Sequence, residues 1–113
     1  MEVFFEARSP ESAKLRDVTL MRARFVLRRL VWLVPTVKVR LSDANALRGG
    51  THKHCRVEVH TQGRGTVIVQ TRADTWRTAL DNALARAARL LLRAIRRIDV
   101  RGRTRRPALD FRP

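Results

Sequence analysis

Five arginines in the second half of the sequence recur at helical spacing and could together bind phosphate groups. They are Arg86, Arg89, Arg93, Arg96 and Arg97. At 100° per residue they fall within an arc of about 100° beside an apolar stripe, and at 1.5 Å per residue they span about 17 Å of helix. A guanidinium group binds phosphate oxygens through two parallel hydrogen bonds, so this arginine stripe suits a polyanion such as nucleic acid.

No acidic residue is interleaved with the arginine stripe, since none occurs between Asp81 and Asp99. Like charges at these spacings repel and weaken a helix by a few tenths of a kcal/mol per pair, so a solvated helix usually interleaves glutamates. The helix dipole favours arginines in the last turns, which accounts for the final three members of the stripe but not for the first two. A polyanionic partner accounts for all five.

The composition points to the same kind of partner. The chain has 113 residues, and 25 lysines and arginines against 10 acidic residues give a formal net charge of +15. Such an excess opposes compaction by self-repulsion and attracts polyanions. Residues 99–113 hold five arginines and two aspartates, or +3, so +12 remains on residues 1–98. We expect residues 1–98 to form one RNA-binding domain and residues 99–113 to be a disordered basic tail.

The N-terminal half predicts a strand, a helix and a further strand. Val3–Ala7 is β-type, and Ser9 with Pro10 is typical of a helix start. The helix is expected to run from Glu11 to about Leu33. Its core-facing stripe at spacings of three and four consists of Leu20, Ala23, Leu27, Leu30 and Val34. Alternation over Val37–Leu41 then predicts a half-buried strand.

The C-terminal half predicts a hairpin followed by a second helix. Cys55–Val59 and Val67–Thr71 alternate about the turn Gln62–Gly65, which is the pattern of two hairpin strands. Asp74 or Thr75 caps a helix whose apolar residues continue to Ile98. The order is β-α-β-β-β-α. We therefore predict an α/β (α+β) two-layer sandwich in which two helices pack on one face of a four-stranded sheet.

The other face of the predicted sheet carries basic side chains. Lys38, Arg40 and Arg56 point to solvent there and form a second candidate RNA contact. The sequence has no Tyr, and Phe4 is the one strand aromatic expected to face solvent. Base stacking on this sheet is therefore not expected.

No catalytic or metal centre is expected, and no cofactor or small-molecule substrate. The acidic residues are scattered, and no nucleophile–base pair or Gly-rich phosphate loop occurs, so the chain is not expected to be an enzyme. His52, His54 and Cys55 are adjacent but lack further ligands, and alternation sends His54 and Cys55 to opposite faces. Cys55 is expected to be a buried apolar residue. A single cysteine, no basic N-terminal leader and no long apolar run together predict a cytoplasmic protein without membrane contact.

Several segments resemble the ribosome hibernation-promoting factors, also called ribosome-associated inhibitor or sigma-factor modulation proteins. The resemblance covers about residues 1–98 and is carried by the element order and three segments. These are Val37–Asn45, Arg48-Gly49-Gly50 with Lys53-His54-Cys55, and Ala73-Asp74-Thr75-Trp76 through Ala79-Leu80-Asp81. The first helix, with Arg16, Arg22, Arg24, Arg28 and Arg29, is more basic than the family pattern.

The resemblance implies a translation regulator under stress. Family members bind the small ribosomal subunit over the mRNA and tRNA sites, and basic residues of their second helix contact 16S ribosomal RNA. The matching positions here are Arg86, Arg89, Arg93 and Arg97, the stripe that the helical wheel gives independently. Two alternatives stay open: a protein-interaction module, and a generic binder of double-stranded nucleic acid.

A second apolar strip on the first helix consists of Val18, Met21, Phe25 and Trp32. We expect this strip to be part of the core, because a helix between a sheet and a neighbouring helix can bury a wide face. The alternative is a partner surface, with weak self-association through Val18, Met21 and Phe25.

Overall fold

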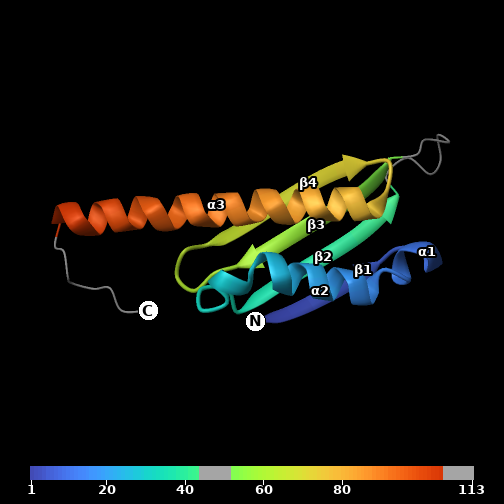
Figure 1. The fold of residues 1–113 in the computed structure, drawn as a ribbon, viewed down its shortest axis with the longest axis horizontal. Coiled ribbons are helices and arrows are strands. Elements are labelled where there is room, and N and C mark those ends of the chain that lie inside the picture. Colours follow the sequence, from blue (N-terminus) through green and yellow to red (C-terminus); the bar gives the residue numbers. More distant parts are fainter. Residues whose placement is uncertain (44–51, 106–113) are drawn as a thin grey trace.

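The structure, a computed structural model, describes residues 1–43 and 52–105, and beyond residue 96 the backbone alone. The elements follow the predicted order, with the first helix divided (Figure 1). Their bounds are β1 Glu2–Ala7, α1 Pro10–Ala13, α2 Arg16–Val26, the 3₁₀ turn η1 Arg28–Leu30, β2 Thr36–Asp43, β3 Lys53–His60, β4 Thr66–Ala73 and α3 Trp76–Arg105.

The four strands form one mixed sheet in the order β1-β2-β3-β4. β1 and β2 are parallel, with Val3 beside Val37, so the chain must cross over between them, and α1, α2 and η1 make that crossover. The other two pairings are antiparallel, and Val57 lies between Val39 and Val69. Gly63 and Gly65 have φ values of 75° and 84°, which lets the chain turn back tightly between β3 and β4.

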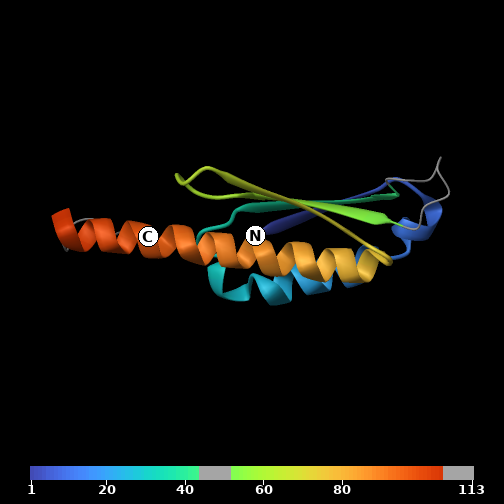
Figure 2. The ribbon, with the colours of Figure 1, turned by 90° about the horizontal axis from the view of Figure 1, so that it is seen from above.

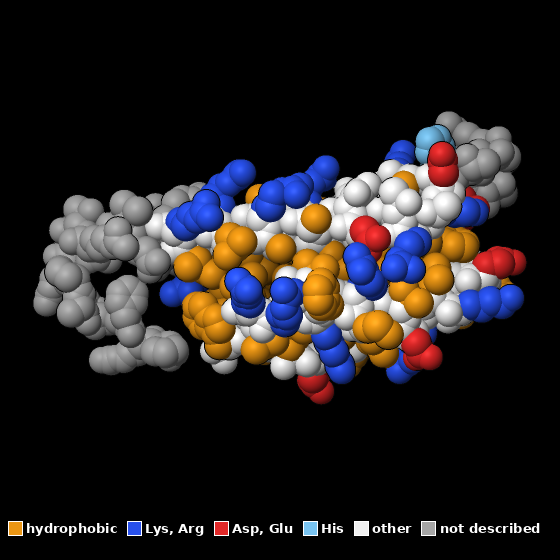
Figure 3. Space-filling view, viewed as in Figure 1, with side chains coloured by type: hydrophobic (Ala, Val, Ile, Leu, Met, Phe, Trp, Pro, Cys, Tyr) orange, Lys and Arg blue, Asp and Glu red, His pale blue; other side chains and the backbone are white. Residues whose placement is uncertain are grey.

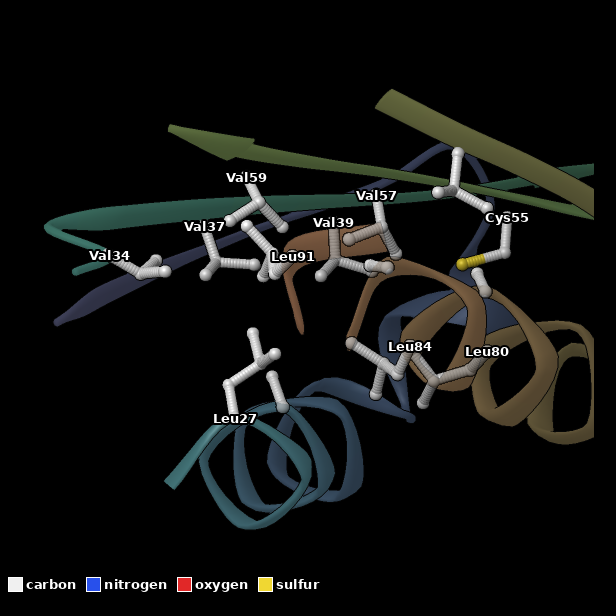
Figure 4. Packing of buried hydrophobic residues seen from close by; sticks show 14 of the residues in the cluster. Leu27, Val34, Val37, Val39, Cys55, Val57, Val59, Leu80, Leu84 and Leu91 are labelled. Carbon is white, nitrogen blue, oxygen red and sulfur yellow. The ribbon is translucent and has the colours of Figure 1, made fainter. Parts of the chain in front are cut away.

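Both long helices cover the same face of the sheet, as predicted (Figure 2). Alternation along the strands sends Val37, Val39, Val57 and Val59 to that face, where they are buried. Figure 4 shows the leucines of the helices directed at these valines. The helix residues fully buried in the core include Leu27, Leu80, Leu84 and Leu91. Burying a leucine contributes about 1.5–3 kcal/mol, so this single interface stabilises both helices.

The starts of α1 and α3 have the side-chain caps that the sequence predicts, whereas α2 begins after Leu15 without one. Ser9 accepts a hydrogen bond from the Ser12 backbone N–H, and the Ser12 hydroxyl closes a capping box with Ser9, so α1 begins at Pro10. At α3, Thr75 rather than Asp74 is the cap, because its Oγ1 accepts from the Thr78 backbone N–H at 3.1 Å.

The prediction of one continuous first helix was wrong. The chain forms α1, α2 and η1 with breaks after Ala13 and Val26. A straight helix from residue 11 to 33 would be about 34 Å long, whereas an eight-residue strand covers about 27 Å. Because the crossover must deliver the chain to Thr36, beside Glu2 at the start of β1, the breaks keep the segment over the sheet.

The second helix is longer than the sequence pattern indicates. α3 continues past Ile98 to Arg105, into the segment expected to be a disordered tail. Every strand of the described sheet precedes α3, so pairing within that sheet does not require the helix to end earlier. The rest of the expected tail, 106–113, lies outside the described residues, so the division at residue 98 stays a prediction.

Candidate nucleic-acid interface

The arginine stripe lies on an exposed side of α3, beside the buried side, and its first two arginines border β4. Arg86, Arg89, Arg93 and Arg96 are all exposed, while Leu84 and the other core residues of α3 are buried. In Figure 3 Lys and Arg side chains follow the edge of α3 in a row. Arg97 lies on the same helix, but its side chain is outside the description. The exposed position on one helix that the helical wheel predicts is thus confirmed for four of the five arginines.

The charge of the stripe is not neutralised within the part of the chain that the structure describes. None of its four described arginines makes an ion pair there. Among the acidic residues of α3 whose side chains the structure describes, the nearest to the stripe is Asp81, and it binds Arg22 of α2 at 3.0 Å and Arg77 at 3.7 Å. The stripe therefore presents a net positive surface to a ligand.

Two of the three basic residues on the open sheet face, unlike the described arginines of the stripe, form ion pairs with carboxylates. Arg40 binds Glu6 at 3.3 Å and Arg56 binds Glu58 at 3.5 Å, so both guanidinium groups already have a carboxylate partner. Lys38 is exposed and makes no ion pair with the described residues. Together with Phe4 these side chains border a hollow of about 270 Å³. This face is opposite to the one covered by the helices, so the structure does not bring Lys38, Arg40 and Arg56 together with the arginine stripe (Figure 2).

A groove between the edge strand β4 and α3 joins the stripe to a residue that the sequence analysis did not select. Its volume is about 660 Å³. Arg72 of β4 lies here beside the first two arginines of the stripe, and no acidic side chain is among the lining residues. They are His54, Gln70, Thr71, Arg72, Asn82, Ala85, Arg86 and Arg89. Strand alternation indicated only that Arg72 faces solvent. Its proximity to α3 depends on β4 being the sheet edge, which local sequence does not reveal.

His54 and Cys55 lie on opposite faces of β3, as alternation predicts. His54 Nε2 is 3.0 Å from Gln70 Oε1 and its Nδ1 is 3.3 Å from Ser42 Oγ, so both ring nitrogens have polar partners. Cys55 is fully buried, and burial raises the pKa of its thiol from 9.0 to about 12. Among the described residues no three His, Cys, Asp or Glu side chains are grouped closely enough to hold a metal ion.

The expectation that the second apolar strip belongs to the core was wrong. Met21 is 67% exposed, Phe25 57% and Trp32 51%, while Val18 is half-buried. α2 turns Ala23 and Leu27 toward the sheet, and a two-layer fold has no further layer to cover its outer side. Self-association through Val18, Met21 and Phe25 stays a prediction. No helix in the described parts of the chain is long and apolar enough to cross a membrane.

The fold of this chain is similar to that of two solved structures. A ribosomal subunit interface protein from Coxiella burnetii superimposes with a TM-score of 0.63 at 16% identity, over 82% of this chain and 96% of that one. The N-terminal domain of Protein Y from Thermus thermophilus gives a TM-score of 0.60 at 20% identity, over 81% and 93%. The sequence matches no protein-family model and no curated protein. The resemblance drawn from the sequence is thus confirmed at the level of the fold.

Proposed function

We propose that this protein binds 16S ribosomal RNA of the small subunit through the arginine stripe of α3. The observation that carries the proposal is a row of exposed arginines that make no ion pair with the described side chains, on a fold similar to that of a ribosomal subunit interface protein. The residues assigned to the main contact are Arg86, Arg89, Arg93, Arg96 and Arg97, with Arg72 at one end.

Binding would be read from the RNA backbone more than from base sequence. The first four stripe arginines, from Arg86 to Arg96, rise by about 4.5–6 Å from one to the next along the helix, close to the distance between neighbouring phosphates of an RNA strand. Each guanidinium can donate two hydrogen bonds to phosphate oxygens. Arg72 adds a cation from the sheet edge, so the β4–α3 groove is the point at which a strand would enter the interface.

A second RNA segment would contact the open sheet face. Lys38 would act first, because it has no carboxylate to exchange, whereas Arg40 and Arg56 would have to leave Glu6 and Glu58. An exposed ion pair contributes about 0–1 kcal/mol, so a phosphate can displace either carboxylate at small cost. We expect these residues to support binding without dominating it.

The expected consequence of docking is that translation stops. A protein held over the mRNA and tRNA path excludes both ligands by occupying their space, and it needs no catalysis to do so. This function requires a cytoplasmic protein. Idling or protecting ribosomes under stress is the role that this mode of binding serves.

One competing function makes a different prediction. A generic binder of double-stranded nucleic acid would use the same stripe but would not prefer ribosomes to plain duplexes. Co-sedimentation with purified small subunits at moderate salt, with a plain RNA duplex in molar excess as competitor, separates the two. We expect the protein to stay with the small subunits and to sediment less with large subunits. Release by the duplex would contradict the proposal.

A further inference from the structure

Apolar side chains are exposed along the line where α2 and α3 meet. Arg22 of α2 contacts Asp81 of α3, which fixes the sides of the two helices that face each other. Phe25, three residues after Arg22, lies on that side of α2, and Leu92, eleven after Asp81, lies on that side of α3. Phe25 is 57% and Leu92 43% exposed. We call this line between the helices the α2–α3 seam, and Figure 3 shows apolar side chains gathered along it.

Contacts within the chain hold Phe25, at the seam, and Trp32, which follows η1. The guanidinium of Arg28 lies 4.2 Å from the centroid of the Phe25 ring and also donates to the Phe25 carbonyl oxygen at 2.7 Å. At the end of the helical segment, Trp32 donates its indole N–H to the Arg29 carbonyl oxygen at 3.1 Å. The indole therefore has no donor left for a ligand, and what it offers is apolar surface. Exposed aromatic side chains that are held in place beside arginines are typical of protein interfaces.

The borders of the seam are positively charged. Arg29 lies in η1, which follows α2, and Arg89 and Arg96 lie one turn before and one turn after Leu92 on α3. All three are exposed, and none makes an ion pair within residues 1–43 and 52–96. An occupant of the seam must therefore present an apolar stripe flanked by negative charge on both sides.

We infer that the α2–α3 seam binds an acidic amphipathic helix of a partner protein. A helix fits the seam because its side-chain ridges pack into the groove between two others. A second copy of this chain does not fit, because its own seam carries the same cations on a molecule of net charge +15. Phosphates do not fit either, because the middle of the seam is apolar and offers them no donors. Arg89 and Arg96 also belong to the arginine stripe, so the partner helix and the RNA would compete for these two side chains. This competition rests on the proposed function, whereas the binding of the helix does not.

The test uses the full chain and a synthetic probe. The probe is a fluorescein-labelled peptide of four helical turns with leucines at i, i+3, i+4 and i+7 and glutamates elsewhere. The control probe has the same composition in scrambled order. By fluorescence anisotropy at moderate salt we expect the amphipathic peptide to bind about tenfold more tightly than the scrambled one, since only it can bury a continuous apolar stripe.

Variants of the chain locate the binding. Phe25→Ser with Leu92→Ser should weaken the amphipathic peptide about tenfold, because both side chains lose apolar contact. Phe4→Ser with Ile68→Ser, a matched pair that is 50% and 49% exposed on the other sheet face, should leave the affinity unchanged. Arg29→Glu should also weaken the peptide, and this variant alters no apolar packing.

Three results would overturn the inference. The first is equal affinity for the scrambled peptide, which would mean attraction by net charge alone. The second is normal peptide binding by the Phe25→Ser, Leu92→Ser variant. The third is a variant that still binds the peptide but no longer binds an RNA oligonucleotide or anionic phosphatidylserine vesicles. That result would assign the seam to RNA or to lipid. The same variant keeps every arginine of the stripe, so its binding to small subunits reports on the proposed function and not on the seam.

Discussion

Arg22 Nε donates to Asp81 Oδ1 at 3.0 Å, and this bond joins α2 to α3 at the beginning of the arginine stripe. Both side chains are about one-third exposed. The pair has two effects. It links the two helices side by side, and it pairs the one carboxylate of α3 whose side chain the structure describes.

Removing the carboxylate of Asp81 should lower the stability of the fold without weakening RNA binding. We expect Asp81→Asn to lower the free energy of unfolding by about 0.5–1 kcal/mol, the range of a partly exposed ion pair. Affinity for small subunits should rise or stay constant, because the surface becomes more positive. Urea unfolding and subunit binding measure the two quantities. Asp17→Asn, exposed and without an ion pair among the described residues, is the control for charge. Weaker subunit binding by Asp81→Asn would show that the pair positions RNA-contacting residues.

The salt dependence of binding should count the phosphate contacts. Four to six arginines on phosphates predict a slope of log K against log salt concentration of about −3 to −5. Arg89→Ala should make that slope shallower by about 0.7–0.9. Arg40→Ala should change it less, because Glu6 already neutralises that side chain. Equal changes for both variants would contradict the distinction between the stripe and the sheet face.

Much of this arrangement is encoded locally in the sequence. Alternation along Val37–Leu41 and Cys55–Val59 predicts which strand residues are buried, and the 3.6-residue period predicts the exposed stripe. These patterns work because each element has one neighbouring layer. What the sequence does not reveal depends on contacts between distant segments. The ion pair of Arg40 with Glu6 requires the β1–β2 register, and the place of Arg72 beside α3 requires the strand order.

The breaks in the first helix have the same origin. Nothing local stops a helix at Ala13 or Val26, but the crossover must return to Thr36. The exposure of Met21 was mispredicted because an apolar period shows that a side could be buried, not that another layer covers it.

Two threonines should respond oppositely to the same substitution. The hydroxyl of Thr19 is buried in α2 without a hydrogen-bond partner among the described residues, so Thr19→Val should raise the free energy of unfolding by about 1 kcal/mol. The hydroxyl of Thr71 donates to the Ala79 carbonyl oxygen at 2.6 Å and links β4 to α3, so Thr71→Val should lower it by about 1 kcal/mol. Urea unfolding gives both values. A loss of stability in Thr19→Val would reveal an unrecognised partner.

Cys55 should make stability fall at alkaline pH. Burial raises the pKa of its thiol from 9.0 to about 12, so above pH 9 the unfolded chain loses the proton and the folded chain retains it. The contribution is fully present below pH 9 and decreases by about 1.4 kcal/mol per pH unit up to about pH 12. Urea unfolding between pH 8 and 10 should show this decrease in the natural chain and a flatter profile in Cys55→Ala. Identical profiles would contradict the burial of the thiol.

The central claim is that the arginine stripe of α3 binds the small ribosomal subunit. Its most direct test is the affinity for purified small subunits of the double variant Arg89→Glu, Arg93→Glu. The control is Arg16→Glu, Arg24→Glu, which makes the same change in net charge at exposed positions on α2. We expect the α3 variant to bind at least about a hundredfold more weakly, since two contacts of about 1.5–3 kcal/mol are lost, and the control to bind nearly as well as the natural chain. Equal losses in the two variants would contradict the account.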